Sequence, residues 1–225
     1  DEAVRVETSA KAVSAGWEPQ LRIVSDTLFP QSAMLDCLAV LAEECPETRL
    51  ESIETVLSGA EEALLEQRCD IAITGIVPPG FLGDPLLRVR FLAVAHRDHP
   101  LHQMERELSY RDLRPHRQVV VRDSAVRRRR DSGWLDAAQR LTVSRMDMSL
   151  KAVCRGLGFA WLPEVVMQEQ LASGELQVLP LREGRERFAD LFIVLPDREL
   201  AGPVTRRAEA LLKAAVGRLD CGLEA

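Results

Sequence analysis

Residues 21–74 read LRIVSDTLFPQSAMLDCLAVLAEECPETRLESIETVLSGAEEALLEQRCDIAIT, and strand-like and helix-like segments alternate along them. Strands are expected at residues 21–24, 50–54 and 70–74. After Pro30, apolar residues recur every three or four positions, and a second helical segment covers 58–66. The resulting order βαβαβ predicts a parallel sheet covered by helices.

A second alternation follows a long strand expected over residues 86–95. Its helices are expected at 110–113, 146–154, 164–172 and 203–216, and its strands at 118–121, 140–143, 159–162, 176–181 and 191–195. Residues 21–96 carry 5 basic and 12 acidic side chains, whereas residues 97–190 carry 17 and 14. This change of sign between two blocks indicates two units rather than one.

The fold class that this pattern predicts is α/β, with two Rossmann-like lobes joined by two crossover strands near Arg97 and Ala189. The expected domains are a helix end at 1–20, lobe I at 21–96 plus 190–225, and lobe II at 97–189. Two α/β lobes joined in this way are expected to place a ligand in their cleft, at the carboxyl ends of the strands.

Residues 3–17 are expected to form a helix of their own. Val6, Ala10, Val13 and Trp17 repeat at spacings of 4, 3 and 4, which is typical of an amphipathic or coiled-coil helix. A helix of this length is marginally stable by itself, so we expect it to pack against a partner that this sequence does not contain.

The composition excludes several classes of protein. Of the 225 residues, 46% are hydrophobic and 28% are charged, which predicts a folded chain, and the net charge of −6 is not that of a free-standing nucleic-acid-binding domain. No segment approaches the roughly 18 uncharged apolar residues of a membrane helix, and residues 1–13 do not have the pattern of a signal peptide. Five scattered cysteines without a CxxC pair fit free thiols in a reducing cytosol. We therefore expect a cytoplasmic protein that does not contact a membrane.

No enzyme motif is present: the sequence lacks GxxxxGK[ST], GxGxxG, GxSxG and HExxH. We therefore expect no enzymatic activity, no catalytic residue and no cofactor. His96, His99 and His102 are spaced three apart, as metal ligands can be. Pro100 prevents the continuous helix that would align them, so no metal site is expected.

Two further features allow a functional and a structural interpretation. A redox switch at Cys37, Cys45 or Cys69 is conceivable, but small buried thiols on an apolar helix face are favoured. The run Arg127, Arg128, Arg129 and Arg130 can bind an anion or a phosphate. An exposed, solvated loop is the favoured interpretation of this run, because no aromatic residues interleave it.

Polar residues follow the ends of the first three expected strands. They are Ser25, Asp26 and Thr27 after the first, Thr55 to Ser58 after the second, and Thr74 with Gly75 after the third. Hydroxyls and free amides at helix N-termini suit an anionic group such as a carboxylate. Taken singly, Asp26 and Ser58 are explained as well by helix N-capping. Their repetition at one edge of a parallel sheet favours a ligand site.

The residues resemble the effector-binding domain of LysR-type transcriptional regulators, a bacterial family whose two lobes have the type 2 periplasmic-binding-protein fold. AGWEPQLRI (15–23) is similar to the end of the family's linker helix entering the first strand, and FPQSAMLDCLAVLAEECPETRLE (29–51) to its first helix and second strand. LLEQRCDIAITG (64–75), HPL (99–101) and AVCRGLGFAWLPE (152–164) match its third strand, its crossover and its late glycine turn, in the family's order.

The resemblance implies a small-molecule effector in the cleft between the lobes, a homodimer or homotetramer, and DNA binding only through the family's winged helix-turn-helix, which we expect to be missing here. The ligand-binding residues that it implies are Ser25, Asp26, Thr27, Thr55, Val56, Thr74, Asp123, Ser124, Gly158, Phe159 and Ala160. The effector is expected to be a carboxylate or, because Asp26 can accept an amine, an amino-acid-like metabolite.

Two alternatives share the fold. A solute-binding protein of a transport system would need an export signal or a lipid anchor, and neither is found in this sequence. An enzyme such as a dehydratase of aromatic amino-acid synthesis would need a catalytic cluster in the cleft, which the sequence does not offer. The effector-sensing domain is therefore the favoured hypothesis.

Overall fold

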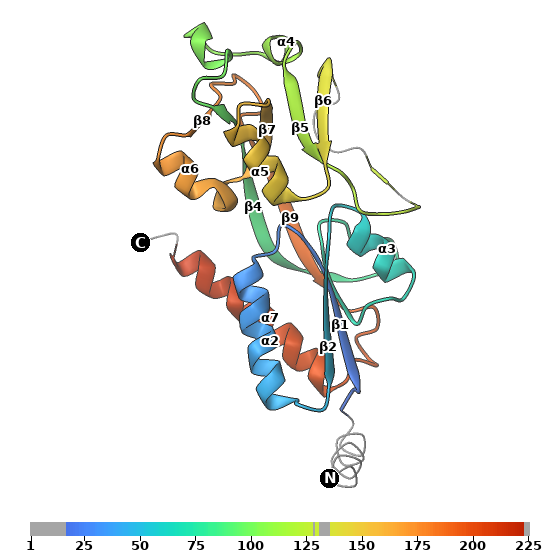
Figure 1. The fold of residues 1–225 in the computed structure, drawn as a ribbon. Helices are drawn as coiled ribbons and strands as arrows, with labels where there is room; N and C mark the ends of the chain where they lie inside the picture. The colour runs from blue at the N-terminus through green and yellow to red at the C-terminus, as the bar shows by residue number, and fades with distance from the viewer. Residues whose placement is uncertain (1–16, 128, 131–135, 223–225) are drawn as a thin grey trace. The chain divides into compact units, whose positions relative to one another are not determined.

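The structure is a computed structural model that describes residues 17–127, 129–130 and 136–222. The chain divides into two compact units, and Figure 1 labels the elements of both. The first unit contains the residues up to Leu87 and those from Leu191 onward, and the second contains Arg88–Asp190. The helix expected over 3–17 lies outside the described residues, apart from Trp17.

The first unit is built on a parallel sheet with one antiparallel edge. Strand β1 (Gln20–Asp26) lies between β2 (Arg49–Thr55) and β3 (Ile71–Thr74), and both neighbours run parallel to it. Strand β9 (Glu186–Val194) pairs antiparallel with β3, which gives the order β2-β1-β3-β9. The expected βαβαβ arrangement is confirmed, and the carboxyl ends of β1, β2 and β3 meet at one edge of the sheet.

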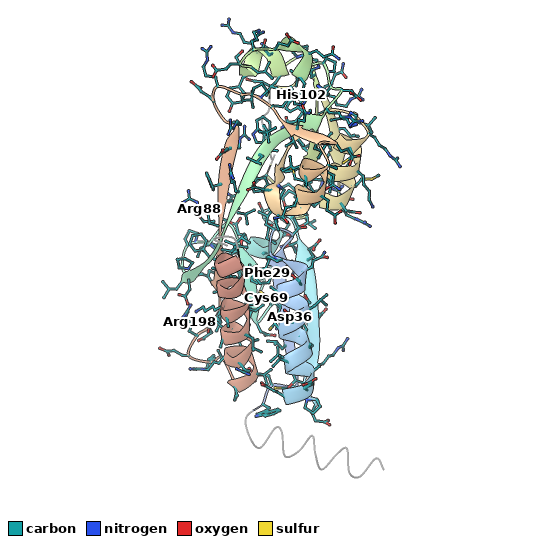
Figure 2. All side chains as sticks on the ribbon, turned by 90° about the vertical axis from the view of Figure 1, so that its left-hand side faces the viewer. Phe29, Asp36, Cys69, Arg88, His102 and Arg198 are labelled. Atoms are coloured by element: carbon teal, nitrogen blue, oxygen red, sulfur yellow. The ribbon has the colours of Figure 1, made fainter. Side chains whose placement is uncertain are left out.

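Three helices cover this sheet: α2 (Gln31–Glu44), α3 (Gly59–Leu65) and α7 (Pro203–Gly222). Helices α2 and α7 lie side by side, as Figure 2 shows, and the Cys37 thiol reaches the Ala208 carbonyl oxygen at 3.9 Å. Helix α3 packs on a separate core that includes Val24, Leu64 and Val194. Apolar residues on both faces of β3 are thereby buried, which explains its near-continuous apolar sequence.

Glu18, just before β1, completes the start of α7. Its carboxylate accepts hydrogen bonds from the backbone N–H groups of Val204 and Thr205, each at 3.0 Å. These groups belong to the first turn of the helix, where backbone N–H groups have no partner inside the helix. Glu18 thus joins two segments of the first unit that lie far apart in the sequence.

The second unit has a mixed sheet with a helix layer on each face. Its strands are β4 (Gly83–His96), whose first residues belong to the first unit, β5 (Arg117–Val121), β6 (Gln139–Val143), β7 (Phe159–Pro163) and β8 (Leu176–Val178). Its helices are α4 (Tyr110–Leu113), α5 (Met146–Cys154) and α6 (Gln168–Ala172), with 3-10 turns at His102–Met104 and Glu164–Met167. The main strand order is β4-β7-β5-β6, and β8 pairs with β4. Buried clusters around Val153 and around Leu113 fill the two faces.

Three elements differ from the sequence-based expectation. The helix expected over 164–172 is a 3-10 turn followed by α6, because Met167 leaves helical backbone geometry and its side chain is fully buried. The strand expected over 176–181 ends at Val178, shortly before Pro180. Strand β9 begins at Glu186, five residues before the apolar run. The apolar pattern did not predict its first half, because those residues are largely polar and partly exposed.

Candidate functional site

The turn between β1 and α2 carries two side-chain hydroxyls, those of Ser25 and Thr27, that form no hydrogen bond with the described part of the chain. Ser25 is 7% exposed and Thr27 is half-buried, and neither hydroxyl has a hydrogen-bond partner among the described residues. Helix α2 then begins after Pro30, which provides no side-chain cap, and its first internal bond is Met34 N–H to Pro30 O. The turn therefore offers hydroxyl donors and a helix N-terminus in the same short segment.

Asp26, between these two residues, has a different role. Its Oδ1 accepts the backbone N–H of Leu28 at 2.9 Å and its Oδ2 accepts that of Leu57 at 3.0 Å, and the residue is 4% exposed. The carboxylate thus ties the β1–α2 turn to the β2–α3 loop. The N-cap interpretation of Asp26 is wrong, because Pro30 is the N-cap of α2. Ser58 does occupy the N-cap position of α3, but its hydroxyl makes no capping bond.

The remaining candidates of the first unit lie next to this turn. Thr55 donates its hydroxyl to the Ser25 carbonyl oxygen at 3.1 Å, and its own carbonyl oxygen accepts the Thr27 N–H at 2.8 Å. Thr74 ends β3 and is fully buried, and its hydroxyl both donates to and accepts from the Ile76 backbone at 3.0 and 3.1 Å. Val56 is half-buried directly after β2. The structure therefore brings these residues to one edge, but it engages the hydroxyls of Thr55 and Thr74 in the fold.

The candidates of the second unit do not come together. Asp123 and Ser124 follow the carboxyl end of β5, whereas Gly158 lies beside Arg117 at its amino end, because β5 and β7 run parallel with Gln118 opposite Phe159. A strand of this length separates the two places by roughly 15 Å.

These second-unit candidates are mostly structural. Both oxygens of Asp123, at 2.8 Å, accept backbone N–H groups, those of Ala125 and Arg130. Phe159 and Ala160 are core residues, 0% and 1% exposed, and Phe159 packs edge-on against Trp161. Ser124 is exposed at the end of β5.

A hollow of about 320 Å³ near the carboxyl end of β5 was not expected from the sequence. Its lining includes Arg122, Arg129, Arg130 and Arg140. Arg127, Arg129 and Arg130 are exposed, as expected for a solvated loop, and two of them, Arg129 and Arg130, also line the hollow, while Arg128 lies outside the described residues. Strand alternation was the signal that could have found this hollow, since it places Arg122 and Arg140 on one face of β5 and β6.

The histidines show no metal-binding arrangement. Among the described residues, no three His, Cys, Asp or Glu side chains group in a way that could hold a metal ion. Burial lowers the pKa of His99 to about 4, and its ring lies 5.1 Å from that of His116. The His99 Nδ1 accepts the Leu101 N–H at 3.2 Å, so this side chain is a neutral part of the fold at physiological pH.

Cys37, Cys45 and Cys69 of the first unit are buried thiols. Burial raises the pKa of both Cys37 and Cys69 to about 11, which keeps them protonated and unreactive near neutral pH. The structural interpretation of these cysteines is therefore favoured over a redox switch.

Nowhere in the described part of the chain does a helix combine the length and apolarity needed to span a membrane.

The two units, each a sheet with helices on both faces, give the chain a mixed α/β fold of the two-lobed type found in periplasmic binding proteins. The model of the LysR substrate binding domain matches residues 14–217. The chain belongs to this family.

Relatives and solved structures agree with this assignment. The probable HTH-type transcriptional regulator YhaJ of Escherichia coli K12 is 33% identical over 182 residues, which cover 79% of this chain and 61% of YhaJ. The C-terminal domains of a LysR family protein from Agrobacterium tumefaciens superpose with a TM-score of 0.68 at 17% identity, over 88% of this chain and 97% of that one. The regulatory domain of CcmR from Synechocystis PCC6803, in complex with 2-PG, gives a TM-score of 0.66 at 14% identity, over 88% and 98%. The chain thus spans about three fifths of the length of YhaJ.

Proposed function

We propose that this chain is the effector-sensing part of a cytoplasmic, DNA-binding transcriptional regulator, and that a small molecule with an anionic group binds at the turn between β1 and α2. The observation that carries the proposal is the pair of hydroxyls of Ser25 and Thr27, which have no partner in the described part of the chain. Buried or half-buried hydroxyls are ordinarily hydrogen-bonded, so a ligand is a natural partner for them. They can donate to a carboxylate without adding a buried charge.

The family and the relatives support the regulatory half of this proposal. YhaJ is named as a transcriptional regulator, and the CcmR domain holds a small molecule. We assign DNA binding to a helix-turn-helix domain outside this chain. The effector would act by favouring the conformations that bind it best, and this shift would reach the DNA-binding part. Neither the solute-binding nor the enzyme alternative has support from these matches.

The structure also bears on the kind of effector. Both carboxylate oxygens of Asp26 accept backbone N–H groups, so an amine of an amino-acid-like effector would have to compete with them. A ligand recognised through its carboxylate by Ser25, Thr27 and the first turn of α2 requires no such rearrangement. We therefore favour a carboxylate effector.

Self-association is the second part of the proposal. Leu35 on α2 is 64% exposed, while Met34 and Leu41 of the same helix are buried within the unit. We infer that this face of α2 packs against a second copy of the chain, as a dimer or tetramer. Sedimentation at micromolar concentration should give a mass above 25.1 kDa, and a monomer would contradict this part.

A thermal-shift screen of carboxylates and amino acids tests the proposed binding directly. A ligand that binds only the folded protein raises its stability by about 2.7 kcal/mol at 100 times Kd, which is easily measured as a higher Tm. Carboxylates are expected to raise Tm, and the matching amides are not. A screen in which amides work as well as carboxylates would refute the anionic-group proposal.

A further inference from the structure

All four histidines of the chain lie together in the second unit. They are His96 at the end of β4, His99 and His102 in the turns that follow, and His116 just before β5. The His99 N–H donates to the His96 carbonyl oxygen at 2.8 Å, and the His102 N–H donates to that of His99 at 2.9 Å. The rings of His99 and His116 lie 5.1 Å apart. We call these four side chains the histidine corner, and Figure 2 labels one of them, His102.

The hydrogen bond that His99 accepts requires a neutral ring. His99 is 7% exposed, and its Nδ1 accepts the Leu101 N–H at 3.2 Å. An imidazole nitrogen that accepts a hydrogen bond carries no proton, so the neutral ring carries its proton on Nε2. A second proton would have to bind to Nδ1, which would then face the Leu101 N–H as another donor. The protonated ring therefore cannot keep this bond.

The surroundings of His99 also disfavour a positive charge. Burial, followed by charge repulsion from His116, His102 and His96, lowers the pKa of His99 to about 4. Burial lowers the pKa of His116 and of His102 too, although a hydrogen bond to the Ala95 backbone opposes this at His102. The Nε2 of His102 is buried and has no hydrogen-bond partner in the described part of the chain. A proton on one ring of the corner thus makes a proton on its neighbour less favourable.

Carboxylates near the corner have partners other than His99. Asp98 lies 3.6 Å from the His96 Nδ1, and Asp112 of α4 pairs with Arg106 at 2.7 Å. The groups that act on His99 electrostatically are the other three histidines. Further titratable groups on the elements around the corner are exposed or half-buried: Arg97, Tyr110, Arg111, Arg114, Arg117 and Glu175.

The bond between His99 and Leu101 ties the corner to the core of the second unit. Leu101 is 1% exposed and belongs to a buried cluster that includes Leu113 and Phe159. If His99 is protonated, the Leu101 N–H loses its acceptor, and a buried donor without a partner is costly. Protonation of one ring therefore acts on the segment that holds Leu101 in this cluster.

We propose that the histidine corner is an acid-sensitive latch, in which protonation of His99 breaks its bond to the Leu101 N–H and releases residues 97–104 from the core of the second unit. An unfolded histidine has a pKa of about 6.5, and folding lowers that of His99. The stability that depends on a neutral His99 is therefore fully present above about pH 6.5 and is lost as pH falls toward 4. This response requires no ligand, so it goes beyond effector sensing.

NMR titration of the histidine Cε1–H signals tests the proposal on the unchanged protein, because the chain has only four histidines. The His99 signal is assigned by its absence from the variant H99N. It should stay at the position of a neutral ring down to about pH 5, below the range in which an unfolded histidine titrates. A His99 signal that titrates with a midpoint near 6.5 would overturn the proposal.

Urea unfolding at pH 8 and pH 5 measures the effect on stability. His99 alone should lower the folding equilibrium constant about 30-fold between these pH values, from its folded pKa of about 4 and an unfolded pKa of about 6.5. H99N should lack this 30-fold part, since its side-chain oxygen can accept the same N–H without titrating. H96N is the matched control: His96 Nδ1 also accepts an N–H two residues on, that of Asp98 at 3.3 Å, but beside a carboxylate. It should keep the pH dependence of the unchanged protein.

Hydrogen exchange at pH 7 and pH 5, corrected for the intrinsic pH dependence of exchange, tells release of the turn from unfolding of the whole unit. Residues 97–104 should gain several-fold more exchange at pH 5 than α5 does, and H99N should not show this difference. If H99N does not fold, H116Q replaces it, because it removes the ring that faces His99 and should lessen the pH dependence. The proposal is overturned if these variants keep the full pH dependence, or if the turn and α5 gain exchange equally.

Discussion

Replacing Asp26 by Ala should destabilise the protein by about 3 kcal/mol, because its carboxylate holds two loops together. The carboxylate accepts the N–H groups of Leu28 and Leu57 at 2.9 and 3.0 Å, and Asp26 is 4% exposed. A hydrogen bond to a charged group contributes about 1.5–3 kcal/mol, so two give at most about 6 kcal/mol. Leu28 and Leu57 are half-buried, so water can satisfy part of what is lost, and the lower figure is expected.

Asp26→Asn should cost about half as much, since its amide keeps one oxygen acceptor and turns an NH₂ group toward the other N–H. Urea unfolding followed by circular dichroism measures both variants, and Asp36→Ala on the exposed face of α2 is the control, expected to change stability by less than about 0.5 kcal/mol. Figure 2 labels Asp36 on this helix. An Asp26→Ala variant as stable as the control would refute the reasoning. An Asn variant that is stable but has lost ligand affinity would show that Asp26 contacts the effector.

Three further predictions concern single groups. Burial raises the pKa of Glu18, but the hydrogen bonds from the start of α7 outweigh this and lower it. The stability that Glu18 contributes is therefore present above the pKa of an unfolded glutamate and is lost as pH falls. Glu18→Gln should cost about 1 kcal/mol in urea unfolding at pH 7, and a cost that is as large at pH 3 would contradict the assignment. Gly158→Ala should lower Tm by several degrees because its Cβ would lie 2.2 Å from the Arg117 carbonyl oxygen, and an unchanged Tm would mean that the strands separate at little cost. Burial raises the pKa of the Cys37 and Cys69 thiols to about 11. Both should therefore react with iodoacetamide at pH 7.5 far more slowly in the folded protein than in the urea-unfolded protein. Equal rates would show that the two thiols are accessible in the folded protein.

Much of the fold follows from sequence patterns that depend on local chemistry. The apolar residues of β1 and β3 and the three-to-four spacing in α2 predicted those elements to within a few residues. The polar first half of β9 could not be found in this way, because a partly exposed strand has no distinctive apolar run. The break at Met167 also depends on a tertiary effect, the burial of one side chain in the core of the second unit.

The candidate site was less predictable, because hydrogen-bond partners come from other elements. Ser25, Thr55 and Thr74 all read as strand-end hydroxyls, yet only the structure shows that Thr55 donates to the Ser25 carbonyl and that Thr74 closes its own turn. Likewise, the carboxylate of Asp26 is engaged by Leu57, which lies 31 residues along the chain. Predicting which polar side chains remain available for a ligand therefore requires knowledge of how the strands pair. Sequence spacing alone does not give that pairing.

The most direct test of the account measures affinity and stability together on Ser25→Ala and Thr27→Ala, using the carboxylate that raises Tm most in the screen. Ser52→Ala, at an exposed position of β2, is the matched control. Each site variant should weaken binding by about 0.5–1.5 kcal/mol, or up to about 3 kcal/mol if the lost bond was to a charged group, while Tm stays at the control's value. A variant that melts early yet binds normally, or variants that both bind as the control does, would contradict the claim that these hydroxyls hold the effector.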